Sequence, residues 1–326
     1  MAQGYFAQPY TWPDLAWCLI HNAVGPSSRH EHLTSFLPRA TTLNVIEPRI
    51  RLAFAGDILP FPKRSLTPEE DFRALLAGVD YLVANFEGTI LTSKAPSVLM
   101  GQIHTPAIVE TLARLHPPSK TVLCCANNHS GDFGRARFEN SCRILRAAGF
   151  LVFGARETPP VRLDPGVSIA GGTLWSNRVC DYLARFEDHA GYHDPSARFN
   201  IFCPHWGYEM QLYPSPAQIE QARALLARWD LIAGHHSHCP QPVTGFTVNR
   251  TRKLLAYSTG DLLYRYRIGK YLDGVVLRVE IGPREDGTWA AGRVAWRFSR
   301  LVFGSGRTAR LCAPANCRYF PAMPAA

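Results

Sequence analysis

The run RIRLAFAGDI occupies residues 49–58 and shows the short, apolar and partly alternating pattern of a β-strand that ends in Gly-Asp. The runs YLVANF at 81–86 and TVLCCA at 121–126 have the same character. Between and after these runs, segments 68–77, 107–115 and 135–148 have the composition and periodicity of helices. This alternation of strand and helix predicts the α/β class.

The second half of the chain continues the pattern and then changes it. Further strands are expected at 150–153, 167–170, 199–203 and 231–233, with a helix at 217–228. The last apolar runs, at 254–257, 275–281 and 292–302, follow one another without clear helices and predict antiparallel β-structure. We therefore expect one domain over 49–326. Residues 1–48 have weak periodicity and read as an extension that is packed on the domain or partly disordered.

Composition favours a soluble, folded protein. Apolar residues make up 46% of the 326 residues and charged residues 19%, which supports a sizeable core. The net charge of +9 attracts anions in general, and a solvated arginine-rich surface explains it equally well. No nucleic-acid-binding motif accompanies it, so a nucleic-acid partner is not expected. No apolar run approaches a membrane span, and no membrane partner is expected.

The nine cysteines are an odd number and lie in apolar contexts such as Cys124, Cys125 and Cys203. This usage is typical of free thiols in a reducing compartment, and we expect a cytoplasmic protein. Cys312 and Cys317 have no second pair with which to form a zinc ribbon, and the sequence leaves open whether they pair with each other.

Polar residues able to bind metals follow the expected strands at their carboxyl ends. Because ligands gather at the carboxyl ends of strands in α/β sheets, we expect these residues to meet at one edge. A mixture of carboxylate, amide oxygen and imidazole is typical of sites for transition-metal pairs. The residues are Asp57, Asn85, Glu87, Asn128, His129, His205, His235, His236 and His238.

Most of these residues have an ordinary structural explanation when each is taken alone. Asp57 could be a turn or cap residue, Asn127-Asn128 is a natural turn dipeptide, and His205 could be a half-buried histidine. The sequence GHHSH at 234–238 is different, because three histidines in four positions after a strand favour a metal site. The order and strand-end placement of the whole set carry the prediction.

Six blocks in this order resemble the CapA-like, or poly-γ-glutamate synthesis, family of the calcineurin-like metallophosphoesterase superfamily. The resemblance spans roughly residues 50–265, and the Asn-Asn-His and His-Trp-Gly blocks are quite specific to the family. The blocks are GDI at 56–58, NFEG at 85–88, ANNHSGDFG at 126–134, PHWGYEM at 204–210, GHHSHCPQPV at 234–243 and YSTGD at 257–261.

The resemblance implies a four-layer α-β-β-α sandwich with one or two divalent ions (Mn, Zn, Fe, Ca or Mg) at one edge. It implies a first ion held by Asp57 and His238, and a second held by Asn128, His205 and His236. Glu87 would be the bridging carboxylate, with Asn85 as the competing residue. His129 would be the acid or base. Asp132 and Glu209 would orient ligands or substrate, and His235 would act from behind the ligands. The resemblance thus implies three catalytic residues: His129, Asp132 and His235. It implies four residues that bind the substrate: Asn85, Asn127, Glu209 and Asp261.

The chain departs from the pattern in two positions. Leu59 stands where classical phosphoesterases have a histidine, which puts plain phosphoesterase activity in doubt, although CapA-like proteins share this gap. Asp261 stands where the family usually has asparagine, which adds negative charge. The membrane anchor common in polyglutamate-synthesis members is not evident, so a role within a membrane-bound polymer synthase is less expected.

The sequence leaves the function open between classes. A metal-dependent enzyme acting on an anionic or peptidic substrate could hydrolyse a phosphoester, cleave or transfer an amide such as a γ-glutamyl bond, or epimerise a peptide. A non-catalytic accessory protein of capsule, polyglutamate or natural-product peptide biosynthesis is the alternative. A nuclease is the least favoured. The metal's identity, the substrate and the oligomeric state are not predicted.

Overall fold

The computed structural model describes residues 11–62, 64–93, 98, 101–264 and 273–320. Its helices are α1 (Trp12–Val24), α2 (Glu70–Leu76), α3 (Ile108–Ala113), α4 (Arg135–Ala147), α5 (His189–Tyr192) and α6 (Pro216–Leu226), with a 3₁₀ turn at Pro118–Lys120. Within these ranges, no helix has the length and apolar character that crossing a membrane requires.

In the described residues the larger sheet has ten strands, in the order β3-β18-β17-β16-β2-β4-β7-β8, with β1 added beside β17 and β15 beside β2. Its members are β1 (Ala40–Thr42), β2 (Ile50–Ile58), β3 (Ser65–Pro68), β4 (Tyr81–Phe86), β7 (Thr121–Cys124), β8 (Leu151–Phe153), β15 (Asp261–Leu263), β16 (Asp273–Pro283), β17 (Trp289–Phe303) and β18 (Thr308–Cys312). Strands β2, β4, β7 and β8 are parallel, whereas β16 and β17 are antiparallel, as the sequence predicts, and β18 adds a further antiparallel strand beside β17.

The smaller sheet has the order β13-β14-β12-β11-β10-β9. Its members are β9 (Val161–Leu163), β10 (Val167–Thr173), β11 (Phe199–His205), β12 (Leu231–Ala233), β13 (Val243–Val248) and β14 (Thr251–Ala256). Strands β10, β11, β12 and β14 run parallel, so the antiparallel pairing expected at 254–257 holds only toward β13. A short pair, β5 (Thr89–Ile90) and β6 (Ile103–His104), lies apart from both sheets.

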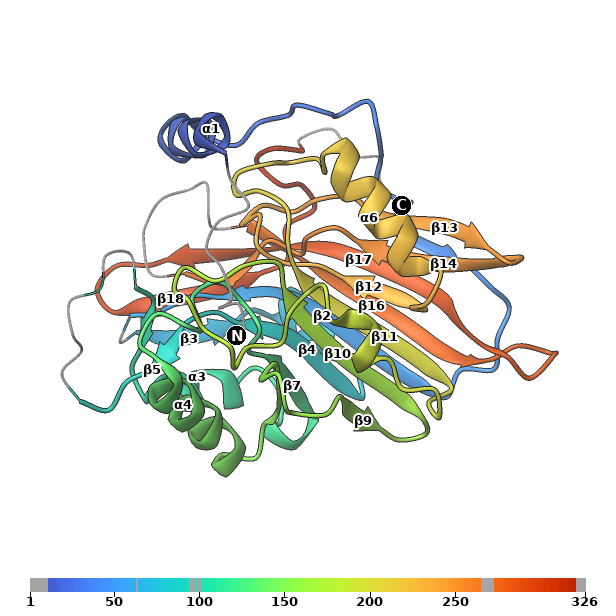
Figure 1. The fold of residues 1–326 in the computed structure, drawn as a ribbon, viewed down its shortest axis with the longest axis horizontal. Coiled ribbons are helices and arrows are strands. Elements are labelled where there is room, and N and C mark those ends of the chain that lie inside the picture. The colour runs from blue at the N-terminus through green and yellow to red at the C-terminus, as the bar shows by residue number, and fades with distance from the viewer. Residues whose placement is uncertain (1–10, 63, 94–97, 99–100, 265–272, 321–326) are drawn as a thin grey trace.

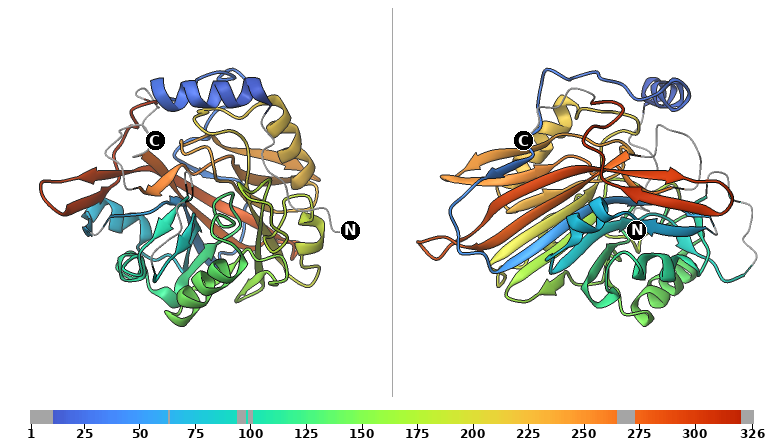
Figure 2. Two further views of the ribbon diagram at one scale, coloured as in Figure 1. Left: turned by 60° about the vertical axis from the view of Figure 1, so that its left-hand side comes forward. Right: turned by 180° about the vertical axis from the view of Figure 1, so that it is seen from behind.

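Three hydrophobic cores hold four layers together (Figures 1 and 2). The central core joins the two sheets, with Phe54 and Trp296 of the larger sheet facing Ile201 of the smaller one. The second core packs α2, α3 and α4 on the outer face of the larger sheet, and the third packs α6 on the smaller sheet. Burial of this apolar surface is the main stabilising term. The expected α-β-β-α sandwich is therefore confirmed.

The N-terminal region, whose residues 1–10 lie outside the described ranges, contains a helix and a strand for which the sequence shows no clear pattern. Helix α1 begins at a capping box, in which Thr11 and Asp14 bond each other's backbone N–H, with Pro13 in the first turn. Strand β1 pairs with β17, so part of the extension is a strand of the larger sheet. Strands β3, β9, β13, β15 and β18 were also not anticipated.

Candidate metal centre

The candidate ligands meet where the carboxyl ends of the parallel strands of both sheets come together. Asp57 lies near the end of β2, Glu87 follows β4, and Asn128 follows β7; His205 ends β11 of the smaller sheet. All of them are almost fully buried. The sandwich therefore brings together residues from segments that are distant in sequence, as strand-end placement predicts.

The segment between β14 and β15 packs closely against a glycine of each sheet at this edge. A Cβ on Gly56 would lie 2.2 Å from the carbonyl oxygen of Gly260, and a Cβ on Gly234 would lie 2.2 Å from that of Tyr257. Only glycine fits such contacts. His236 and His238 have φ values of 99° and 54°, which side chains rarely adopt. Such backbone strain clusters at functional sites, where surrounding structure maintains it.

One set of donor atoms carries no formal charge, and we call it the imidazole–amide group: Asn128, His205 and His236. Nε2 of His205 lies 2.9 Å from Oδ1 of Asn128 and 3.0 Å from Nδ1 of His236. Burial, followed by repulsion from neighbouring histidines, lowers the pKa of both imidazoles well below the usual value. Neutral imidazole is the form that binds metal. The Trp175 ring packs edge-on against His236, at 4.3 Å between centroids.

The second set is acidic, and we call it the carboxylate group: Asp57, His238 and Asp261. Nδ1 of His238 lies 3.0 Å from Oδ1 of Asp261 and 3.6 Å from Oδ2 of Asp57. Burial raises the pKa of Asp261 to about 7 despite the opposing effect of His238. Burial alone would lower the pKa of His238, but the surrounding carboxylates outweigh it and raise that pKa well above its usual value. The buried Leu59 offers no ligand here, and Asp261 from β15 lies beside Asp57.

Glu87 lies between these two groups and carries an unsatisfied oxygen. Its Oε1 is 3.8 Å from Nε2 of His238 and 3.9 Å from Nε2 of His129, and it has no hydrogen-bond partner among the described residues. Burial raises the pKa of Glu87 well above its usual value, and Asp57 and Asp261 add to this effect. A buried carboxylate oxygen without a partner is costly, and a cation bound beside it would remove that cost.

Asn85 and Asn127 form an amide network beneath the ligands. The Asn85 side-chain NH₂ donates to Oδ1 of Asp57 at 2.8 Å and to Oε2 of Glu87 at 3.4 Å. Its oxygen accepts from Nδ2 of Asn127 at 3.2 Å, and Oδ1 of Asn127 accepts from Ser130 at 2.9 Å. Both asparagines are fully buried. These contacts orient the two carboxylates, whereas contact with a substrate stays a prediction.

His129 is aimed at the centre by Asp132. Its Nδ1 lies 2.7 Å from Oδ2 of Asp132, which leaves Nε2 facing Glu87. Nδ2 of Asn177 lies 3.1 Å from the same Nδ1, and the backbone N–H of Asn177 donates to the carbonyl of Asn128 at 2.9 Å. A histidine with one nitrogen fixed by a carboxylate and the other facing the ligands has the arrangement of an acid or base.

His235 is enclosed behind the ligands. Its Nδ1 lies 3.2 Å from the hydroxyl of Thr259 and 3.4 Å from Oδ1 of Asp57. Its Nε2 is buried and has no hydrogen-bond partner within the described ranges, and burial lowers its pKa. This placement suits support of Asp57 better than contact with a substrate.

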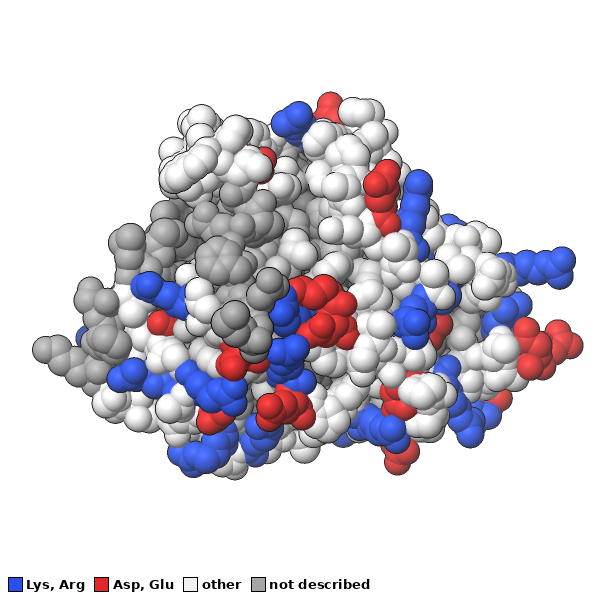
Figure 3. Space-filling model, viewed as in Figure 1, with Lys and Arg blue, Asp and Glu red and all other residues white. Residues whose placement is uncertain are grey.

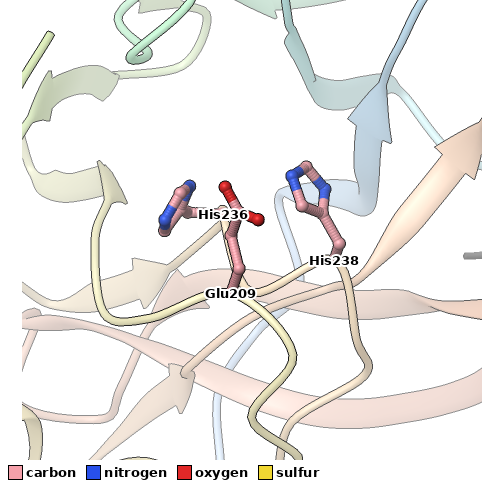
Figure 4. A group of neighbouring side chains, drawn as sticks. All are labelled: Glu209, His236 and His238. Carbon is pink, nitrogen blue, oxygen red and sulfur yellow. The ribbon is translucent and has the colours of Figure 1, made fainter. Parts of the chain in front are cut away.

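Glu209 reaches the centre from the loop after β11. A carboxylate oxygen of Glu209 and ring nitrogens of His236 and His238 all lie within 4.8 Å of one another. Figure 4 shows the carboxylate pointing between the two rings. Ligand atoms of Asp57, His238 and Asp261 also lie within 4.8 Å of one another. The same is true of ligand atoms of Asp57, Glu87 and His205.

Sequence reasoning missed three residues that contact the centre. Nε2 of His104 lies 2.9 Å from the backbone carbonyl of Glu87, and its ring stacks on Phe86. Trp175 and Asn177 lie in the loop after β10. The strand-end rule could have found this loop if β10 had been expected to extend to Thr173. His104 lies on a two-residue strand that gives no such signal.

Comparisons with known proteins agree with the resemblance in sequence. The family model described as bacterial capsule synthesis protein PGA_cap matches residues 51–173 and 176–266. The chain is 26% identical over 239 residues to "Capsule biosynthesis protein CapA" of Bacillus anthracis, covering 65% of this chain and 57% of the relative. It is 28% identical over 212 residues to "PGA biosynthesis protein CapA" of Bacillus subtilis (strain 168), covering 57% and 53%. The chain thus spans about half the length of these curated relatives.

Solved structures show a more distant likeness. A protein described as a candidate 5′-nucleotidase from Staphylococcus aureus, in complex with α-ketoglutarate, has a TM-score of 0.44 at 13% identity, over 76% of this chain and 53% of its own. A hypothetical protein from Thermus thermophilus has a TM-score of 0.45 at 13% identity, over 76% and 98%. The family match covers more than half of the chain, and this protein therefore belongs to the bacterial capsule synthesis PGA_cap, or CapA-like, family.

Proposed function

We propose that the chain is a divalent-metal-dependent hydrolase that cleaves a phosphoester or an amide in an anionic or peptidic substrate. One observation carries the proposal: the imidazole–amide group and the carboxylate group lie side by side, with an unpartnered oxygen of Glu87 between them in the part of the chain that the structure describes. Buried polar atoms in such numbers are retained for function rather than for stability.

The donor set fits cations. The imidazole–amide group offers neutral nitrogen and oxygen donors, which suit Zn, Mn or Fe, and the carboxylate group also suits Mg or Ca. We place the first cation at Asp57, His238 and Asp261, the second at Asn128, His205 and His236, and Glu87 between them. Bound cations would supply Lewis-acid polarisation of the substrate and lower the pKa of water.

The protein's own residues supply the proton transfer and the orientation. Nε2 of His129 faces Glu87 and is placed to pass a proton to a leaving group, and Asp132 fixes the ring through Nδ1. Asn85 and Asn127 keep Asp57 and Glu87 in place. Glu209 and Asp261 line the side of the centre next to His238.

Hydrolysis is favoured over epimerisation because, among the described residues and apart from the groups placed as cation ligands and Glu209, His129 is the one acid or base with a ring nitrogen facing the centre. Epimerisation removes a proton from one face of a carbon and delivers another to the opposite face, which needs a second group. His235 is the other candidate, but it is 1% exposed and is held between Thr259 and Asp57.

A nuclease role has little support from the face seen in Figure 3. On the face seen in Figure 3, basic and acidic side chains are interspersed and do not form a continuous basic track. The relatives' names refer to capsule and PGA biosynthesis, which favours an anionic polymer or peptide with amide links as the substrate. The nine cysteines are thiols and most of them are buried, which supports a reducing, cytoplasmic setting as part of this proposal.

The test is metal content, measured by mass spectrometry on protein without a histidine tag. We expect about one to two bound ions in the wild type and loss of them in the double variant His236→Ala with His238→Ala. Substrate panels of phosphomonoesters and γ-glutamyl amides would follow, with His129→Gln as the matched inactive variant. If the wild type binds no ion and gains no thermal stability from any of them, the enzyme proposal fails, and an accessory role replaces it.

A further inference from the structure

Helix α1 lies outside the region that matches the family, yet it contacts a residue of the metal centre. The inward face of α1 packs on the loop that carries Glu209. The buried thiol of Cys18 lies 3.9 Å from the backbone carbonyl of Glu209, and the hydroxyl of the neighbouring Tyr208 lies 3.5 Å from a carboxylate oxygen of Asp14.

The backbone of this loop is held from both sides. The N–H of Ser27, just after α1, donates to the carbonyl of Met210 at 2.8 Å, and the N–H of Leu212 donates back to Ser27 at 2.9 Å. On the other side, the N–H of Met210 donates to the carbonyl of Ser237 at 2.9 Å, between the two ligand histidines. Met210 itself has a φ of 58°. The loop is thus a bridge between the N-terminal segment and the histidine cluster.

The side chain of Glu209 is held by the helix as well. Nδ2 of Asn22 donates to Oε2 of Glu209 at 3.1 Å. Asn22 is anchored in turn by a 3.0 Å bond from the same amide to the carbonyl of Cys18. The carboxylate that accepts this bond is the one that points between His236 and His238 in Figure 4.

We propose that α1 is a functional part of the metal centre and that Asn22 is a positioning residue, which holds the Glu209 carboxylate between His236 and His238, where it contributes to cation binding. This inference rests on the proposed function, because it assumes that a cation binds there. Orientation of a ligand by an outer partner typically changes metal affinity by about 10–100-fold.

The full chain, freed of metal, is titrated with Mn²⁺ and with Zn²⁺ by calorimetry. We expect Asn22→Ala to weaken binding by about 10-fold, and Asn22→Gln, which keeps the amide donor, to recover most of the loss. Leu19→Ala is the matched control, because Leu19 lies on the outward face of the same helix and is 63% exposed. It should bind both ions like the wild type.

A double-variant cycle separates positioning from a general effect on folding. In a Glu209→Gln background, adding Asn22→Ala should weaken binding by less than 2-fold, roughly, because the carboxylate it positions is already gone. A full additional loss in that background would overturn the inference, as would equal effects of Asn22→Ala and Leu19→Ala. Absence of Mn²⁺ and Zn²⁺ binding by the wild type would overturn both proposals. Wild-type binding with an unchanged Asn22→Ala variant would overturn only this one.

Discussion

The imidazole–amide group and the carboxylate group lie at the same edge of the sandwich but differ in charge. The first joins neutral donors from both sheets, at 2.9 and 3.0 Å from one another. The second holds two carboxylates around one histidine, and burial raises the pKa of Asp261 to about 7. A neutral group suits a metal that prefers nitrogen, whereas a charged group favours a hard cation and is destabilising when empty. The two halves of the centre are therefore not equivalent.

Replacement of Asp57 should have the largest effect on metal binding, because it removes a charge that distinguishes the carboxylate group from the imidazole–amide group. Its Oδ1 accepts from Asn85, and its Oδ2 accepts from the backbone of His236 at 3.1 Å. We expect Asp57→Asn to weaken ion binding in both groups by about 100-fold or more, measured as bound metal after dialysis.

Asp80→Asn is the control for this variant, because Asp80 contacts the opposite end of β2 through the backbone N–H of Arg51. It should retain the wild-type metal content. Retention of both ions by Asp57→Asn would contradict the placement of Asp57 as a ligand of the carboxylate group that also holds the backbone of His236.

A pair of variants tests whether the groups select different ions. His205→Ala removes a neutral nitrogen, and Asp261→Asn removes a charge. We expect about 10–100-fold weaker Zn²⁺ binding for the first and a comparable loss of Mg²⁺ or Ca²⁺ for the second. Competition with a chelating dye measures both. Identical losses for the two variants would show that the groups share a single ion.

His104 contacts the backbone of Glu87, whose carboxylate lies between the groups. Burial lowers the pKa of His104 to about 4, so the ring is neutral, and its Nε2 is within hydrogen-bond distance of the backbone carbonyl of Glu87. We expect His104→Gln to reduce hydrolytic activity by about 10-fold with little change in metal content. His116→Gln is the control, since the His116 ring contacts Thr121 instead. Equal hydrolytic activity of the two variants would show that His104 does not contribute to the function of the site.

The smallest expected effect concerns pH and the metal-free protein. The folded-state pKa of Asp261 is raised from 3.8 to about 7, so the folded state binds more protons than the unfolded state between these values. The contribution of Asp261 to the free energy of unfolding therefore falls as pH rises from about 4 to about 7. Asp261→Asn removes the buried charge, and its melting temperature should gain about 3 °C or more over the wild type across this range.

The measurement is calorimetric melting in the presence of a chelator at both ends of the range. If the melting temperatures of Asp261→Asn and the wild type differ by the same amount at pH 4 and pH 7, the pKa of Asp261 is not raised in the folded protein, and the prediction is wrong. Added Mg²⁺ or Ca²⁺ should reduce the difference in melting temperature at pH 7, because a bound cation neutralises the carboxylate of the wild type.

The sequence predicts the central strands and the edge where they end, because long apolar runs signal buried strands regardless of what surrounds them. Strand β4 (Tyr81–Phe86) has the predicted bounds, and β2 differs from its prediction by one residue. Short edge strands such as β1 and β3 lack that signal, because each has too few residues to show a period of its own. Helix α1 was missed although Thr11 and Asp14 form a recognisable capping box, because prolines nearby suggested irregular structure.

Within the site, strand-end residues were predicted to come together, but the division into two groups was not. Asp261 was expected to contact substrate, and the structure places it beside His238 because β15 pairs in parallel with β2. His104, Asn177 and Asn22 reach the centre through long-range folding of short segments. Such contacts depend on how distant segments pack in three dimensions. Local patterns in a single sequence do not specify this packing.

The pairing of Asp57 with Asp261 across β2 and β15 joins the beginning of the domain to a segment near its end. A ribosome must therefore synthesise the chain beyond Asp261 before the carboxylate group can exist. The carboxylate group is therefore assembled only after most of the chain has been made. Contacts so distant in sequence also predict slow folding, with an opportunity for chaperones to act first.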